Sequence, residues 1–146
     1  MKQLFFLTDN SYVGLILRIA AGAIMLPHGA QKMLGLYGGY GYSATMQYLT
    51  QTMGLPKLIS FLVIMIEFAG AICLIAGFAT RLWAIAFIAV MLGAIITTAY
   101  SNGLFMNWTG SQKGEGFEYH LLMIAICIGL ILTGSGKFGV DSLLQS

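Results

Sequence analysis

Four segments of this sequence are apolar over about the length that a helix needs to cross a lipid bilayer. They cover residues 11–35, 56–79, 81–101 and 117–133. A spanning helix takes about 20 mostly apolar residues, so a chain of 146 residues has no room for a separate soluble domain. Only 8% of the residues are charged, against about a quarter in soluble domains. The sequence therefore predicts an all-α integral membrane protein, one domain over residues 1–146 that forms a four-helix bundle.

The connections between the four segments differ in length. The turn between the second and third segments is formed at Thr80 and Arg81, which predicts a tight antiparallel hairpin. The other two connections are longer and must lie together on the opposite side of the membrane. Within the first of them, Met46, Leu49 and Met53 share one side of a helical turn, which predicts a short amphipathic helix on the membrane surface.

The charges are few and scattered. The net charge is +2, and no run of basic residues is present, so the pattern is not that of a nucleic-acid-binding protein. Three basic residues near span ends fall on each side of the predicted membrane, which leaves the orientation almost undetermined. Because Lys2 and Arg81 lie in short segments close to span ends, we expect both termini in the cytoplasm and the chain in the cytoplasmic membrane.

Three basic side chains lie along one stripe of the first span. At about 100° per residue, Arg18 and Lys32 fall within about 40° of each other and His28 lies about 80° from Arg18. A charge inside hydrocarbon costs at least about 3 kcal/mol, so each needs a partner. Glu67 lies near the middle of the second span. We expect Arg18 to pair with Glu67, because a guanidinium stays protonated and can bind a carboxylate through two hydrogen bonds. Such a pair could serve only to hold two helices together.

The polar residues near the long connections are candidates for ligand binding or proton exchange. His28 follows Pro27, which is expected to bend the helix and open space beside the imidazole. The alternatives are that a neighbouring helix satisfies His28 and that Lys32 reaches outward to the headgroups. The candidates are His28, Lys32, Glu67, Glu118 and His120. Their spacing matches no metal-ligand pattern, so no metal site is expected.

Two cysteines lie in the second and fourth spans, at comparable distances from the end of the bundle that holds the termini. Cys73 and Cys127 are surrounded by apolar residues and form no C-x-x-C motif. We expect both to pack as small hydrophobic side chains. A disulfide between them is the alternative.

Taken together, these segments resemble the DoxX family of small four-helix membrane proteins over nearly the whole chain. The pieces are Leu17-Arg18-Ile-Ala-Ala-Gly22, Pro27-His28-Gly29-Ala-Gln-Lys32, Gly54-Leu-Pro56, Glu67 with Ala69-Gly70, Gly77-Phe-Ala-Thr-Arg81, Gly134-Ser-Gly136 and Val140-Asp141-Ser142. The resemblance implies a four-helix bundle in the cytoplasmic membrane with a role beside quinones, and a basic and acidic pattern at Arg18, His28, Lys32 and Glu67.

The sequence is compatible with three functions. The first is a membrane component of a quinone- or thiol-linked redox system, in which a polar cluster binds a quinone and a separate redox protein supplies the electrons. No cofactor motif is built into the chain. The second is a non-enzymatic scaffold or chaperone-like subunit. The third, less favoured, is a carrier of small molecules or lipids. The bilayer is the one certain partner, and a homo-oligomer stays open.

Overall fold

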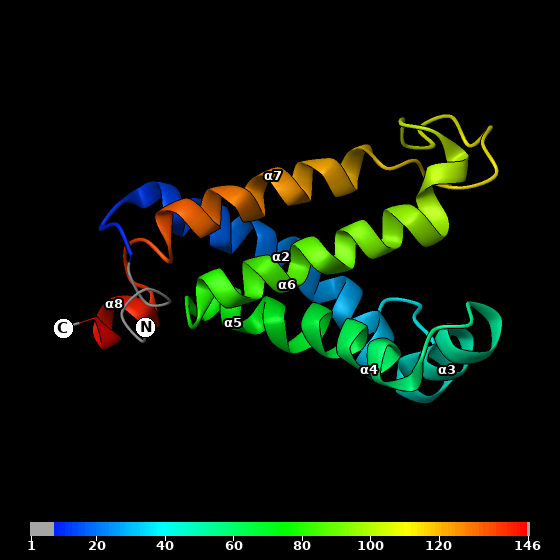
Figure 1. Cartoon of the computed structure of the whole chain (residues 1–146), viewed down its shortest axis with the longest axis horizontal. Coiled ribbons are helices and arrows are strands. Elements are labelled where there is room, and N and C mark those ends of the chain that lie inside the picture. The colour runs from blue at the N-terminus through cyan, green and yellow to red at the C-terminus, as the bar shows by residue number, and fades with distance from the viewer. Residues whose placement is uncertain (1–7, 146) are drawn as a thin grey trace.

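The computed structural model describes residues 8–145 and is helical, with no strand in that range (Figure 1). Three of its helical runs are long and apolar enough to cross a membrane, and a fourth apolar helix is shorter. The predicted all-α fold is confirmed, and helices occupy the four predicted segments, with ends within three residues of the predicted ones. The spans are α2 (Tyr12–Leu34), then α4 (Lys57–Met65) with η2 (Ile66–Gly70) and α5 (Ala71–Ala76), then α6 (Thr80–Ala94) with η3 (Ile95–Ala99) and η4 (Tyr100–Asn102), and α7 (Glu118–Thr133).

The two ends of the bundle differ in what they carry. At one end lie the two ends of the described range, Thr8 and Gln145, the hairpin between α5 and α6, and the short helix α8 (Val140–Leu144) (Figure 1). At the other end lie both long connections, the first of which contains α3 (Gly41–Gln47) and η1 (Tyr48–Thr52). The predicted helix in the first long connection is thus present. Lys2, on which the orientation prediction depends, lies outside the described residues, so a cytoplasmic location of the termini stays a prediction.

Helix α2 packs against both the second span and α7, and α6 packs against α7. Between them lies a core of fully buried side chains that includes Ala21, Leu74, Phe87, Cys127 and Leu130. Glycines allow the closest contacts. A Cβ atom on Gly29 would collide with the backbone of Glu67 and Phe68, so α2 and η2 touch backbone to backbone at this depth.

Within residues 8–145, three five-residue π-helical turns occur: η2 lies between α4 and α5, while η1 and η3 follow the ends of α3 and α6. Such turns account for well under 1% of residues in most proteins and often mark functional sites. Pro27 produces no such interruption, because α2 remains α-helical through it. The irregular turns lie in the first long connection and in the second and third spans, where no proline indicates them.

Arg18 does not pair with Glu67, so the predicted buried pair is wrong. Its guanidinium donates from Nε to the Ser135 carbonyl at 2.9 Å, from Nη2 to the Lys137 carbonyl at 3.2 Å, and from Nη1 to the Ile75 carbonyl. The helix register explains this. With Gly29 against Glu67, the antiparallel second span brings the end of α5 to Arg18, and the last carbonyls of a helix need donors and favour a cation.

Asp141 caps the start of a helix at the same end of the bundle, where Arg18 caps the end of one. This carboxylate is 1% exposed, and it accepts hydrogen bonds from the amides of Ala79 at 2.6 Å and Thr80 at 2.9 Å. These amides begin α6, where a negative charge is favoured. Arg18 and Asp141 thus cap the two helix ends that meet at the hairpin, and both tie the C-terminal segment to it.

Candidate functional site

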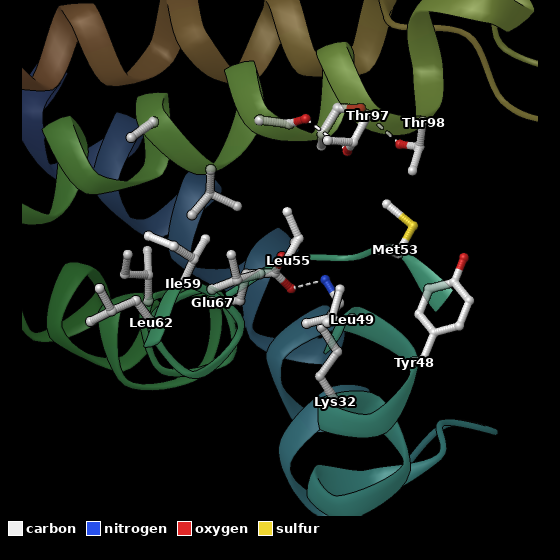
Figure 2. A pocket seen from close by; sticks show the side chains of 16 residues that line it. Lys32, Tyr48, Leu49, Met53, Leu55, Ile59, Leu62, Glu67, Thr97 and Thr98 are labelled. Atoms are coloured by element: carbon white, nitrogen blue, oxygen red, sulfur yellow. Dashed lines mark hydrogen bonds and ion pairs between the residues drawn. The ribbon is translucent and has the colours of Figure 1, made fainter. Parts of the chain in front are cut away.

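A cavity of about 490 Å³ lies between the second and third spans, on the side of the long connections (Figure 2). Its volume is in the range of sites for small organic ligands. Apolar side chains form most of its wall, and its charged residues are Lys32 and Glu67. The lining residues are Lys32, Tyr48, Leu49, Met53, Leu55, Ile59, Leu62, Val63, Ile66, Glu67, Ala89, Val90, Gly93, Ala94, Thr97 and Thr98.

The cavity exists because the two spans diverge. They meet at the short hairpin and separate toward the opposite end, where α3 and η1 lie (Figure 1). Small residues on the α6 side, Ala89, Gly93 and Ala94, leave the space between the diverging spans unfilled. A Cβ atom added to Gly93 would meet no atom within 4 Å. The space is therefore a consequence of both the splayed hairpin and the small side chains.

Each of the three π-helical turns contributes to the wall of this one cavity. Tyr48 and Leu49 come from η1, Ile66 and Glu67 from η2, and Thr97 and Thr98 from η3. A π turn adds a residue to the helix and shifts the side chains that follow it around the axis. Rare turns that converge on one space distinguish it from an ordinary packing gap.

Lys32 and Glu67 form an ion pair at the cavity wall, shown by the dashed line in Figure 2. The Lys32 ammonium donates to Glu67 Oε2. Only 4% of the Glu67 side chain is exposed, against 34% of the Lys32 side chain. An ammonium has three donors, and the two that Glu67 does not use have no hydrogen-bond partner among residues 8–145. The prediction that Glu67 needs a cation is correct, but Lys32 supplies it.

The α6 side of the cavity offers acceptors. The Thr97 hydroxyl donates to the Gly93 carbonyl at 2.8 Å, and the Thr98 hydroxyl donates to the Ala94 carbonyl at 2.7 Å. Their protons are thus used within the helix, and their lone pairs can accept a hydrogen bond. The wall therefore combines free N–H donors at Lys32 with hydroxyl acceptors on the third span, in otherwise apolar surroundings.

The two histidines lie away from this cavity. His28 is exposed on the surface of the chain, and its ring centroid is 6.2 Å from that of Tyr119. The ring of Tyr119 is also 5.6 Å from that of His120, and its hydroxyl donates to Met25 Sδ at 3.1 Å. Positions 28 and 32 differ by about 40° around the axis of α2. His28 therefore lies nearer to Tyr119 of α7, and Lys32 lies nearer to Glu67 of η2.

Glu118 holds a loop in place. Its Oε1 accepts from the Met106 amide and from Trp108 Nε1, each at 3.1 Å. The predicted candidates therefore separate into three places. Lys32 and Glu67 lie at the cavity, His28 and His120 lie beside Tyr119, and Glu118 lies under the second long connection.

Sequence reasoning missed several residues of the cavity wall. Tyr48 lies on the predicted surface helix, and Thr97 and Thr98 form a polar pair inside an otherwise apolar span. That pair, one turn beyond Gly93 and Ala94, is a signal that could have indicated the site. Both cysteines are free, and neither lines the cavity.

Comparisons with known proteins agree with the architecture. The sequence model of the DoxX family matches residues 13–100. A Bacillus subtilis (strain 168) protein named "Putative oxidoreductase CatD" is 32% identical over 127 residues, which are 87% of this chain and 83% of that protein. No solved structure matches the chain.

Two Escherichia coli (strain K12) proteins are also similar. "Inner membrane protein YqjF" is 32% identical over 72% of this chain and 75% of its own length. "Inner membrane protein YphA" is 30% identical over 87% of this chain and 86% of its own length. Together with the apolar helices, these relatives indicate a multi-pass protein of the inner, cytoplasmic membrane. The matched region holds both members of the Lys32–Glu67 pair and three of the four spans, and the chain belongs to the DoxX family.

Proposed function

We propose that this protein is the membrane component of a quinone-linked redox system and that the cavity between the second and third spans binds the quinone head group. The observation that carries the proposal is an apolar cavity of about 490 Å³ with the Lys32–Glu67 pair at its wall. Apolar walls suit a quinone ring, and Lys32 has donors for a carbonyl oxygen. The relative named as an oxidoreductase supports the same class of chemistry.

The residues of the cavity suit the proton part of such a reaction. Reducing a quinone to a quinol takes two electrons and two protons, and each carbonyl oxygen gains one O–H bond. The electrons come from a separate redox protein. The Lys32 ammonium can donate a hydrogen bond to the oxygen and then its proton, while Glu67 holds the ammonium in position. Thr97 and Thr98 can accept hydrogen bonds from the quinol hydroxyls.

A thiol-linked version of the system needs its thiols on a partner. Cys127 is fully buried in the core, Cys73 is half-buried, and neither lines the cavity. Disulfide exchange requires access to a thiolate, which a buried apolar position does not provide. The quinone is therefore the favoured ligand of this chain, and thiol chemistry is left to the partner.

Filling the cavity tests the proposal. Gly93→Phe places a ring in the open space beside Gly93, and Ala125→Phe places the same ring on an exposed face of α7. Each variant and the parent are reconstituted in nanodiscs and titrated with a quinone that carries a short isoprenoid tail. We expect saturable binding near one per chain in the parent and in Ala125→Phe, and an affinity at least about tenfold weaker in Gly93→Phe. Equal binding by all three proteins, or no saturable binding by the parent, would overturn the proposal.

The same variants separate this function from a scaffold or chaperone-like subunit. A scaffold uses its surfaces, so Gly93→Phe that folds normally would retain full function in cells. A redox component would lose function with that variant and keep it with Ala125→Phe. Growth or quinone reduction in membranes that contain each variant measures the difference.

A further inference from the structure

A second cavity of about 510 Å³ adjoins the first, beside the last turn of α2. Its walls come from the end of α2, the turn that follows it, and α3 with the start of η1. Lys32 and Tyr48 line both cavities. The other lining residues are Gln31, Gly38, Gly39, Tyr40, Ala44 and Thr45. We call the first the inner cavity and the second the outer cavity.

The outer cavity is a built feature of the chain. The turn that forms it packs tightly on α2, because a Cβ atom at Gly39 would collide with the backbone of Gln31. Gln31 Nε2 also donates to the Tyr37 carbonyl at 3.0 Å, which holds the turn to the helix. Thr45, on α3, is buried at its wall. The cavity lies beside the end of α2, at the end of the bundle that carries both long connections.

Lys32 lies at the boundary between the two cavities. Its ammonium contacts Glu67 on the inner side, while about a third of its side chain remains exposed. The titratable groups that face it are Glu67 from η2, Tyr48 from η1 and Tyr40 from the turn. Tyr119 of α7 lies within electrostatic range of Glu67. A lysine side chain has four carbons between its backbone and its charge, and can reach either cavity without movement of the helix.

We propose that the outer cavity is a water-filled vestibule and that Lys32 carries protons from it to a ligand in the inner cavity. An N–H bond of the ammonium breaks as an O–H bond forms on the ligand oxygen, and the neutral amine later takes a proton from water in the outer cavity. Two such cycles supply the two protons of a quinol, and the partner redox protein supplies the two electrons. The transfer step rests on the quinone function proposed above.

The charge on Glu67 gives this movement a direction. A protonated Lys32 is attracted to the carboxylate and stays beside the inner cavity. Once the proton has left, that attraction is lost and the neutral amine is free to turn toward the vestibule. Protonation there restores the attraction. Proton uptake therefore occurs on the side of the long connections.

Thiol labelling tests the vestibule without any quinone. In a background with Cys73→Ala and Cys127→Ala, Ala44→Cys reports on the outer cavity and Ala94→Cys on the inner one. A charged, membrane-impermeant methanethiosulfonate is added to proteoliposomes. We expect Ala44→Cys to react at least about tenfold faster than Ala94→Cys. Adding Lys32→Ala should raise the rate at Ala94→Cys at least about tenfold, and Lys57→Ala, which removes an exposed charge outside both cavities, should not.

Two results would overturn the vestibule. Equal rates at both positions in the parent background would mean that no barrier separates the cavities, and an unchanged Ala94→Cys rate with Lys32→Ala would mean that Lys32 is not the barrier. If Lys32→Ala folds poorly, the double variant Lys32→Ala with Glu67→Gln is used in its place, because it leaves no unpaired carboxylate. Its labelling rate at Ala94→Cys is measured in the same way. These outcomes do not depend on quinone binding, so they are distinct from a failure of the proposed function.

Lys32→Arg tests the proton transfer separately from the vestibule. Lys32→Arg keeps the positive charge beside Glu67, but a guanidinium does not release its proton in proteins. With bound quinone and dithionite as the electron donor, we expect Lys32→Arg to bind quinone within about threefold of the parent and to form quinol at least about tenfold more slowly. A merely structural Lys32 predicts equal rates of quinol formation, and that result would overturn the transfer step.

Discussion

Lys32 and Glu67 pair across 35 residues of sequence and lie at the wall of an apolar cavity. The pair depends on the contact one helical turn away, where Gly29 brings α2 against the backbone of η2. Glu67 is almost fully buried, and Lys32 keeps donors that no described residue uses. A charge pair with spare donors facing an apolar space is suited to hold a neutral ligand with a hydrogen-bond acceptor.

The pair should show energetic coupling. We expect Lys32→Met to lower the free energy of unfolding by about 2 kcal/mol, because it leaves the buried Glu67 carboxylate without its cation. Combining it with Glu67→Gln should recover part of this loss, with a coupling energy of at least about 1 kcal/mol. Unfolding in detergent measures each variant. The pair Arg18→Leu and Glu67→Gln is the control and should be additive, and coupling there instead would contradict the observed pairing.

Arg18 is expected to be structural. Arg18→Leu removes the side-chain donors of the carbonyls of Ile75, Ser135 and Lys137. We expect a loss of about 3 kcal/mol in the free energy of unfolding. Arg18→Lys should recover only part of it, because one ammonium cannot reach carbonyls on two segments. Lys113→Gln, an exposed change in the second long connection, is the control. Normal stability of Arg18→Leu would refute this role.

Asp141 should stabilise the start of α6. Asp141→Ala removes the acceptor for the amides of Ala79 and Thr80, and we expect it to cost about 1 to 2 kcal/mol. Amide hydrogen exchange measures this loss at the start of α6. The amides of Ala79 and Thr80 should exchange faster, while amides in the middle of α6 should change little. Asp9→Ala, an exposed carboxylate, should leave both rates unchanged. Unaltered protection in Asp141→Ala would show that the cap is not needed.

Glu118 should order the second long connection without affecting the cavity. In a Trp83→Phe background, Trp108 is the remaining tryptophan. Glu118→Ala removes the acceptor of its indole N–H, so we expect stronger quenching of its fluorescence by iodide. Quinone binding should stay within about twofold of the parent, because Glu118 does not line the cavity. Weakened binding would place Glu118 in the ligand site after all.

The spans could be predicted because each is an apolar run of about 20 residues, a signal that does not depend on how helices pack. The partner of Glu67 could not, because two antiparallel helices can shift by a turn, about 5.4 Å, without any change in apolar pattern. Such a shift decides between Arg18 and Lys32. Gly29, which sets the register, is recognisable only once its contact with Glu67 is known.

The pair Thr97 and Thr98 signals a polar site in the third span, but the shape of the cavity could not be predicted from the sequence. Residues of the π-helical turns at Tyr48–Thr52, Ile66–Gly70 and Ile95–Ala99 line the cavity, and none of these turns contains a proline. The candidate cluster was predicted as one group because Lys32, Glu118 and His120 share a side of the membrane. Depth alone does not determine which neighbour each side chain faces.

Photocrosslinking with a quinone that carries an aryl azide on its ring tests the cavity most directly. After illumination of the parent in nanodiscs, digestion and mass spectrometry locate the labelled peptides. We predict labelling confined to Lys32 and to segments 48–55, 59–67 and 89–98, which line the inner cavity, with labelling reduced by unmodified quinone and by Gly93→Phe. Labelling centred on α7 or on the surface around His28, or labelling that unmodified quinone does not reduce, would contradict a quinone site at Lys32 and Glu67.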